Sequence, residues 1–381
     1  MGSSKDSGNE GGGGKGDSKG DGKSDDRGDS KGSNMGGMGG IGDGKGGGMG
    51  GGRGDEGSDE SGGGKTRPNC SRDSGPGNKK MNERAQKLLQ MQALPLAEKI
   101  EATKRRIREW LDRFPEAKVA FSGGKDSTVL LDIARQVSPG ILASFANTGL
   151  EYPEIVKFVR QTPNVIEVRP KMDFLSVIQK YGYPVVSKRV ARQIKDVQRS
   201  KSDTLTRRKR LTGLCPDGIV RSCLAIPKKW IWLVKSGITI SDTCCEILKK
   251  KPLDALGAAP IIGTMAEDSG QRAEMYFRYG CNAFDLKRPR SAPISFWTEA
   301  DVWCYIHTQK LAYSRIYDMG YTRTGCMFCM FGLHLEGHPN RFERMATTHP
   351  SLFRYCMDGP PGLRTVIKTV YRMDLPAGVK K

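Results

Sequence analysis

The sequence predicts an α/β fold in which a mostly parallel sheet is flanked by helices and followed by a cysteine-rich C-terminal extension. Two observations lead to this prediction. Apolar runs of strand length alternate with segments of helical periodicity from residue 95 onward. The first strand-like run, at 118–121, passes through a glycine turn directly into a helical segment. Because parallel neighbours in a sheet need crossover connections, which helices provide, this alternation favours parallel strands.

Each predicted element has its own signature. The first helix carries apolar residues at helical spacing between 100 and 114, with a basic face opposite, and Pro115 ends it. The strand at 118–121 follows. Later strand-like runs occupy 140–149, 164–170 and 259–266, and the intervening helical segments include 153–161 and 174–181.

The first 80 residues are excluded from this core. They are mostly Gly, Ser, Lys and Asp, and they carry 13 basic and 13 acidic residues. A segment with so little apolar surface cannot offset its ordering entropy. We therefore expect a disordered Gly-rich tail at 1–80, a nucleotide-binding α/β domain at 81–290 and a helical, cysteine-containing extension at 291–381. Met81 opens the first periodic segment and is an alternative start of the protein.

The formal net charge of +20 falls on the folded part, because the tail is neutral. Such a surface favours polyanions, although a merely solvated basic face is the plainer alternative. No apolar run reaches 18 residues and no signal-peptide pattern is present. We expect a cytoplasmic protein without a membrane span, in which the ten cysteines are metal ligands, nucleophiles or core thiols rather than disulfides.

The hexapeptide S-G-G-K-D-S at 122–127 connects the first strand to its helix. Two glycines let the backbone approach an anion, the helix N-terminus supplies amides and a favourable dipole, and the lysine and hydroxyls add polar contacts. The order of residues is not that of a Walker A loop. The turn is therefore predicted to bind pyrophosphate, with an ordinary βα turn capped by Asp126 or Ser127 as the alternative. Lys125 is expected to be an exposed loop lysine.

The hexapeptide resembles the PP-loop of the ATP pyrophosphatases, which have a Rossmann-like, adenine nucleotide alpha hydrolase-like fold. Further motifs are similar, in order and spacing, to the PAPS/APS reductase-like (phosphoadenosine phosphosulfate reductase) family. They are N-T-G-L-E-Y-P-E at 147–154, D-T-C-C-E-I-L-K-K-K-P-L-D-A-L at 242–256, G-T-M-A-E-D-S-G-Q-R at 263–272, P-I-S-F-W-T-E-A-D-V-W-C-Y-I at 293–306 and G-C-M-F-C at 325–329.

This resemblance implies a site for ATP and Mg²⁺. Lys125 and Asp126 are the candidate catalytic residues, and Met265 stands where the family has an arginine. A helix cap and a surface arginine would also explain the segment 268–272, and a strand-end turn would explain Thr148 and Glu151. The candidate nucleotide-binding residues are Ser122, Gly123, Gly124, Lys125, Asp126, Ser127, Thr148, Asp268, Ser269 and Arg272.

Four cysteines are the candidate metal ligands: Cys244, Cys245, Cys326 and Cys329. The resemblance implies a 4Fe-4S cluster, because APS reductases of the family bind one through a matching Cys-Cys and Cys-x-x-Cys. Adjacent cysteines do not easily reach one small tetrahedral zinc, whereas a cubane offers separate iron corners. Zinc and unligated core thiols remain alternatives. Cys215 and Cys223 could form a rival set and are left unassigned.

The resemblance leaves several functions open. The intact loop favours ATP itself, hence adenylation of an oxyanion or nucleic-acid acceptor with pyrophosphate release, coupled to sulfur transfer and served by a sulfur donor protein. An APS/PAPS reductase, which forms sulfite, is the alternative, but Cys356 lacks the E-C-G context of that nucleophile and is expected to be packed. A nucleic-acid-binding protein with a vestigial nucleotide site is the second alternative. Nucleic acid and a small oxyanion stay equally open, and the candidate backbone contacts are Lys188, Arg189, Arg192, Lys195 and Arg199.

Overall fold

The structure, a computed structural model, describes residues 76–257 and 259–376. The predicted tail therefore lies outside the described residues up to position 75. The first described element is α1 (Pro76–Gln92), which begins five residues before the expected boundary. Arg84 joins it to α9 (Gly270–Tyr279) by donating to the backbone carbonyl of Arg278 at 2.8 Å.

A six-stranded sheet forms the centre of the fold, with strand order β3-β2-β1-β5-β7-β6. All neighbouring strands are parallel except β6 and β7, which are antiparallel. The fold is therefore α/β with a mostly parallel sheet, as predicted. The strands are β1 (Val119–Ala120), β2 (Ala143–Ala146), β3 (Val165–Val168), β5 (Ile261–Ile262), β6 (Asn282–Ala283) and β7 (Arg290–Ser291). β7 straddles the expected domain boundary at 290/291, and that division stays a prediction.

The chain reverses its direction of travel across the sheet at β1. From β1 it moves through β2 to β3, whereas β5 pairs with the opposite edge of β1. In open parallel sheets, ligands bind beyond the carboxyl ends of the strands at such a switch point. The loops that leave β1 and β5 are therefore the expected place for a site.

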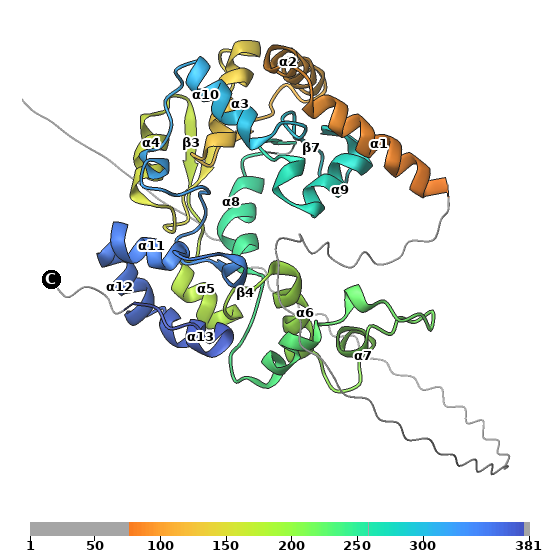
Figure 1. Cartoon of the computed structure of the whole chain (residues 1–381), viewed down its shortest axis with the longest axis vertical. Helices are drawn as coiled ribbons and strands as arrows, with labels where there is room; N and C mark the ends of the chain where they lie inside the picture. Colours follow the sequence, from red (N-terminus) through yellow and green to blue (C-terminus); the bar gives the residue numbers. More distant parts are fainter. Residues whose placement is uncertain (1–75, 258, 377–381) are drawn as a thin grey trace, which may run out of the picture. The chain divides into compact units, whose positions relative to one another are not determined.

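Helices pack against the sheet (Figure 1), and buried residues of α2 (Leu96–Arg113) hold several of them in place. Trp110 is fully buried and donates its indole N–H to the carbonyl of Ala259 at 3.0 Å. Lys99, also buried, pairs with Asp301 of α10 (Glu299–Thr308) at 2.7 Å. α2 ends at Arg113, in agreement with the stop predicted at Pro115.

A second, two-stranded sheet lies outside the central one. β4 (Val185–Val186) pairs in parallel with β8 (Met330–Phe331), although 145 residues separate Val185 from Met330. The Tyr371 hydroxyl accepts the Val186 N–H at 2.6 Å and donates to the Met330 carbonyl at 2.8 Å. This bridge, from the last described helix, fixes the segment after residue 326 against the start of α6 (Lys188–Arg199).

The remaining helices connect these parts of the fold. None of the helices within 76–376 is long and apolar enough to cross a membrane. The α-helices are α3 (Lys125–Val137), α4 (Pro153–Gln161), α5 (Phe174–Tyr181), α7 (Leu205–Thr212), α8 (Lys251–Asp254), α11 (Arg341–Thr348), α12 (Pro350–Asp358) and α13 (Leu363–Tyr371). The 3₁₀-helices are η1 (Ser222–Leu224), η2 (Lys228–Lys235), η4 (Ala266–Asp268), η5 (Arg315–Tyr317) and η6 (Leu333–Leu335), and η3 (Glu246–Lys250) is a π-helix.

Candidate functional site

The S-G-G-K-D-S loop lies at the carboxyl end of β1 and leads into α3, whose first residue is Lys125. Gly123 has a φ of +71°, and a Cβ there would lie 2.7 Å from the Val159 side chain of α4. A Cβ on Gly124 would lie 2.5 Å from Oγ1 of Thr324. Both distances are too short for a side chain, so the loop needs glycine at both positions. The predicted strand, glycine turn and helix are all present.

Hydroxyl groups fix the shape of this turn. The Ser127 and Thr128 hydroxyls donate to the Gly124 carbonyl at 2.9 and 3.0 Å, and the Ser122 N–H donates to the Ser127 hydroxyl at 3.2 Å. The Ser122 and Ser127 hydroxyls also lie 3.1 Å apart. These hydroxyl groups therefore form hydrogen bonds with the loop backbone in this structure. Ser122 and Ser127 also line the cavity beside the loop.

Lys125 is buried rather than exposed, with 6% of its side chain accessible. Its ammonium pairs with Asp126 at 2.9 Å and with Glu299 at 3.2 Å. Burial opposes the charge, but the hydrogen bond and charge of Asp126 outweigh it and raise the pKa of Lys125. Burial raises the pKa of Asp126 in spite of this bond, and the charges of Asp268 and Glu299 act in the same direction. The expectation of an exposed lysine is therefore wrong, because Glu299 and Tyr317 approach the loop from a distant part of the sequence.

A polar cavity of about 310 Å³ opens beside the loop. The end of β5 supplies its opposite wall, and it passes so close that a Cβ on Gly263 would lie 3.0 Å from Cα of Ser127. Asp268 accepts hydrogen bonds from Arg272 and from Arg323, the latter at 3.4 Å. The lining residues are Ser122, Gly124, Lys125, Asp126, Ser127, Gly263, Met265, Glu267, Asp268, Arg272, Glu299, Tyr317, Arg323 and Thr324.

Three of the predicted nucleotide-binding residues do not line this cavity, namely Gly123 within the loop, Thr148 and Ser269. Ser269 caps α9, accepting the Arg272 N–H at 3.4 Å, and lines a neighbouring cavity. Thr148 donates from its backbone N–H and its hydroxyl to the Glu151 carboxylate at 2.9 to 3.0 Å. Glu151 in turn pairs with Lys249 at 3.2 Å. Contact of Ser269 and Thr148 with nucleotide stays a prediction, and in this structure Thr148 positions Glu151.

Seven lining residues were not among the candidate site residues. Three of them, Gly263, Met265 and Glu267, belong to the quoted 263–272 motif, and the other four are Glu299, Tyr317, Arg323 and Thr324. Tyr317 and Thr324 contact the loop directly, since the Tyr317 hydroxyl accepts the Lys125 N–H and Thr324 lies against Gly124. All four are far from the loop in sequence. Glu299 belongs to the quoted 293–306 motif, and Arg323 and Thr324 directly precede the Cys-x-x-Cys turn. Closeness to those motifs was therefore the signal that could have identified them.

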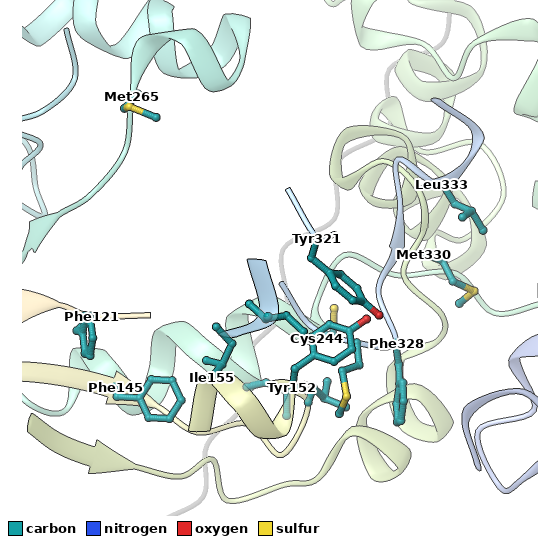
Figure 2. Close-up of a cluster of buried hydrophobic side chains, with 14 of the residues drawn as sticks. Phe121, Phe145, Tyr152, Ile155, Cys244, Met265, Tyr321, Phe328, Met330 and Leu333 are labelled. Carbon is teal, nitrogen blue, oxygen red and sulfur yellow. The ribbon is translucent and has the colours of Figure 1, made fainter. Parts of the chain in front are cut away.

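The four candidate metal ligands come together at the edge of a buried cluster. Figure 2 shows Cys244 within this cluster, which also includes Tyr152, Tyr321 and Phe328. The hydrogen bond between the two thiols raises the pKa of Cys244 and lowers that of Cys245. The charges of Cys326 and Cys329 also act on Cys244. The tandem pair and the Cys-x-x-Cys pair therefore share one neighbourhood, as expected.

Cationic side chains surround these thiols. Lys188 and Lys249 act on Cys245, and the Arg341 guanidinium donates to the Cys329 carbonyl at 2.9 Å. Burial raises the pKa of Cys326 to about 12, although Lys249 opposes this. Lys188, at the start of α6, is exposed. Positive charge near thiols favours the thiolate form that binds metals.

The four candidate metal ligands share a neighbourhood without forming one compact group. Within the described residues, no group of three or more Cys, His, Asp or Glu side chains is gathered as closely as a single metal ion requires. Four soft sulfur donors suit an iron–sulfur cluster or a structural zinc, and the assignment of a 4Fe-4S cluster stays a prediction. Cys215 contacts the Gly213 carbonyl at 3.7 Å within the turn after α7, and Cys223 lies in η1. Neither is needed to complete the set of four.

The predicted basic face lies on α6, opposite its buried residues. Arg192 and Lys195 both pair with Asp242, which lies two residues before the tandem cysteines. Arg199 donates to the Tyr181 carbonyl at 3.3 Å and stacks over that ring. These three side chains therefore already have protein partners, and binding of nucleic acid by this face stays a prediction.

Comparison with known proteins agrees with this geometry. The family model for the phosphoadenosine phosphosulfate reductase domain matches residues 116–189 and 225–331. This match includes the loop, the β5 end and all four cysteines. It omits 190–224, which contain most of α6, all of α7, and Cys215 and Cys223.

Individual relatives are similar over more than half of this chain. An uncharacterized protein of Methanocaldococcus jannaschii is 25% identical over 247 residues, which are 63% of this chain but only 46% of that protein. The chain thus spans about half the length of this relative. Adenosine 5'-phosphosulfate reductase of Bacillus anthracis is 25% identical over 234 residues, 61% of this chain and 82% of that protein. The crystal structure of phosphoadenylyl-sulfate (PAPS) reductase from Candida auris aligns over 65% of this chain and 93% of that chain, at 15% identity and a TM-score of 0.36. From the matched domain and its motifs, the chain belongs to the PAPS/APS reductase-like family of PP-loop proteins.

Proposed function

We propose that this protein uses ATP to adenylate an acceptor oxygen, releasing pyrophosphate, and that sulfur then replaces the activated oxygen. The observation that carries the proposal is the complete S-G-G-K-D-S loop, placed at the N-terminus of α3 and facing a 310 Å³ polar cavity. Loop amides and the helix dipole suit the β- and γ-phosphates. A substrate such as APS has no β,γ-pyrophosphate that would need this loop.

Lys125 has the leading role in the first step. The acceptor oxygen attacks the α-phosphorus of ATP, the bond from that phosphorus to the bridging oxygen breaks, and pyrophosphate leaves. Lys125 exchanges its carboxylate partners for phosphate oxygens and stabilises the charge that develops on the leaving group. Asp126 and Asp268, freed from their cations, offer the oxygen ligands that Mg²⁺ prefers. Mg²⁺, when bound, supplies further neutralisation of the phosphate charge.

The four cysteines have their role in the second step. Cys244, Cys245, Cys326 and Cys329 would hold a 4Fe-4S cluster, which supplies soft iron sites for sulfur when it is bound. Hydrosulfide from a donor protein attacks the activated carbon or phosphorus, and AMP leaves with the original oxygen. No oxidation state changes in this exchange, so no reductant is required when sulfur is delivered as hydrosulfide.

Reduction of APS or PAPS is the second candidate, favoured by the similarity to the Bacillus anthracis reductase. That chemistry needs an accessible thiolate that attacks the substrate sulfur. Cys356, the last cysteine of the chain, is fully buried in α12, and burial raises its pKa. A thiol in this state is a poor nucleophile, which favours adenylation.

The two candidates release different products. Protein kept under anaerobic conditions should release pyrophosphate from ATP in the presence of a suitable acceptor, and should release no sulfite from APS with a thiol donor. Lys125→Ala is the control for pyrophosphate release. Sulfite formation without ATP turnover would favour the reductase, and the absence of both products would favour a binding protein with a vestigial site.

A further inference from the structure

A second cavity, of about 730 Å³, lies on the other side of the 323–326 turn. The segments before and after the Cys-x-x-Cys turn line it, namely 321–326 and 331–344, together with Tyr152. This volume is in the range of cavities that hold a ligand of nucleotide size. A sulfate-sized oxyanion would leave most of it empty.

This cavity joins the two candidate centres. Arg323 and Thr324 line both it and the nucleotide cavity, and Cys326 lines it as well. A ligand bound here would lie between the phosphates of ATP and one of the four thiols. An acceptor that is first adenylated and then receives sulfur must be reachable from both places, and this cavity satisfies that requirement.

The walls combine aromatic rings with arginines. The buried Tyr152 and Tyr321 line the cavity, with ring centroids 4.8 Å apart, and the half-buried Phe331 forms another part of the wall. Arg344 lies over the Tyr321 ring at 5.5 Å, while Arg323 has 71% of its side chain exposed. Flat apolar faces next to guanidinium groups suit a base stacked beside its phosphate.

Not every basic side chain of the cavity is available to bind a ligand. Arg341 is held by Glu336, with one contact at 2.7 Å, and by the Cys329 carbonyl. His338 pairs with Glu343 at 2.9 Å. Within the described part of the chain, the Arg344 guanidinium has a 3.4 Å hydrogen bond to the Pro339 carbonyl besides its ring contact, so among these groups it can turn toward a phosphate at the lowest cost.

We propose that this cavity, which we name the acceptor groove, binds one nucleotide unit of a single-stranded nucleic acid. The base lies against Phe331, and its phosphate is bound by Arg344 and Arg323. The inference rests on the proposed function, because it identifies the acceptor of that reaction as a nucleotide. Single strands fit the groove because an unpaired base can enter a cavity that a duplex cannot.

The test measures binding of fluorescently labelled single-stranded RNA and DNA oligonucleotides to the full chain by anisotropy. Arg344→Gln should weaken binding about fivefold to tenfold and lower the slope of log affinity against log salt by about one, as for a lost phosphate contact. Phe331→Leu keeps the apolar volume but removes the ring, and should weaken binding about fivefold. Arg108→Gln, an exposed arginine of α2, is the matched control and should bind normally. A preference for RNA over DNA would identify the 2′-hydroxyl as part of the recognised group.

ATP binding is measured separately on the same variants and should be unchanged, since Arg344 and Phe331 do not line the nucleotide cavity. Normal oligonucleotide binding by both Arg344→Gln and Phe331→Leu would overturn the acceptor groove while leaving adenylation intact. A loss of binding in Arg189→Gln of α6, in place of a loss in those two variants, would lead to the same conclusion. Failure of the unaltered protein to bind ATP would overturn the proposed function itself. Thermal unfolding of each variant verifies that it is folded.

Discussion

The hydroxyl of Tyr317 accepts the backbone N–H of Lys125 at 2.7 Å, and so occupies the first amide of α3. This amide is one of the donors that a phosphate would need at the helix N-terminus. Thr324 lies against Gly124 in the same region. The loop between α10 and β8 therefore provides the hydrogen-bond partner that a nucleotide would have to replace.

Removal of the Tyr317 hydroxyl should strengthen the binding of ATP. Tyr317→Phe keeps the ring, which packs against Trp303 at 5.3 Å, but leaves the Lys125 amide free. We expect ATP to bind about fivefold more tightly, corresponding to about 1 kcal/mol for one hydrogen bond that no longer competes. Titration with ATP measures the change. Tyr313→Phe, which loses a bond to Asp318 away from the loop, is the matched control. Weaker binding by Tyr317→Phe would indicate that the hydroxyl contacts the nucleotide instead.

Lys125→Ala should abolish ATP turnover, and its effect on folding should be small but measurable. The substitution leaves Asp126 and Glu299 without their shared cation. Because Glu299 is half exposed, water can compensate much of this loss, and we expect a decrease of about 1 kcal/mol in the free energy of unfolding. Pyrophosphate release and urea denaturation are the two measurements. Undiminished turnover would remove this lysine from the mechanism.

The four thiols should bind iron together. Protein purified without oxygen should contain about four irons and four sulfides per chain, and Cys326→Ser or Cys244→Ser should lose most of both. Cys304→Ser is the control, because Cys304 is exposed on α10. Iron and sulfide analysis with an absorption spectrum provides the measurement. Stoichiometric zinc without iron would contradict the cluster, and dependence on Cys215 and Cys223 would contradict the ligand set.

Lys249 should stabilise the fold more than its neighbour does. Lys249→Met leaves the buried Glu151 carboxylate without its cation, at a cost of about 2 kcal/mol. Lys250→Met removes only an exposed pair with Glu246, worth less than about 0.5 kcal/mol. Urea denaturation of the two variants in the metal-free state separates the effects. Equal midpoints would show that water, rather than Lys249, solvates Glu151.

The sequence was sufficient for features that depend on near neighbours. The periodicity before Pro115, the alternation of strands and helices, and the two glycines of the loop are local, and the structure confirms them. Grouping of Asp268 and Arg272 with the loop followed from the family motifs. The burial of Lys125 did not follow, because its cover comes from Glu299, 174 positions away.

Pairing of β4 with β8 was equally beyond the sequence. Each strand has two residues, which is too short for a period-two pattern, and the pairing depends on the Tyr371 hydroxyl from the last described helix. The pairing of Arg192 and Lys195 with Asp242 could not be predicted from the sequence, because Asp242 lies in a separate motif. Long-range partners of this kind change the role of a side chain without leaving any local mark.

Thr324 and Cys326 are two positions apart, and they belong to different centres. Thr324 lies against the glycine turn that would hold the phosphates, while Cys326 is one of the four thiols. A displacement of Thr324 would also displace Cys326, because only two peptide bonds connect them. If ATP and iron bind at these two centres and the turn couples them, the linkage must be reciprocal: the factor by which iron changes the affinity for ATP is the factor by which ATP changes the affinity for iron. Removal of the iron would then appear at the nucleotide site as a change in the affinity for ATP, which titrations of the iron-bound and iron-free protein would measure.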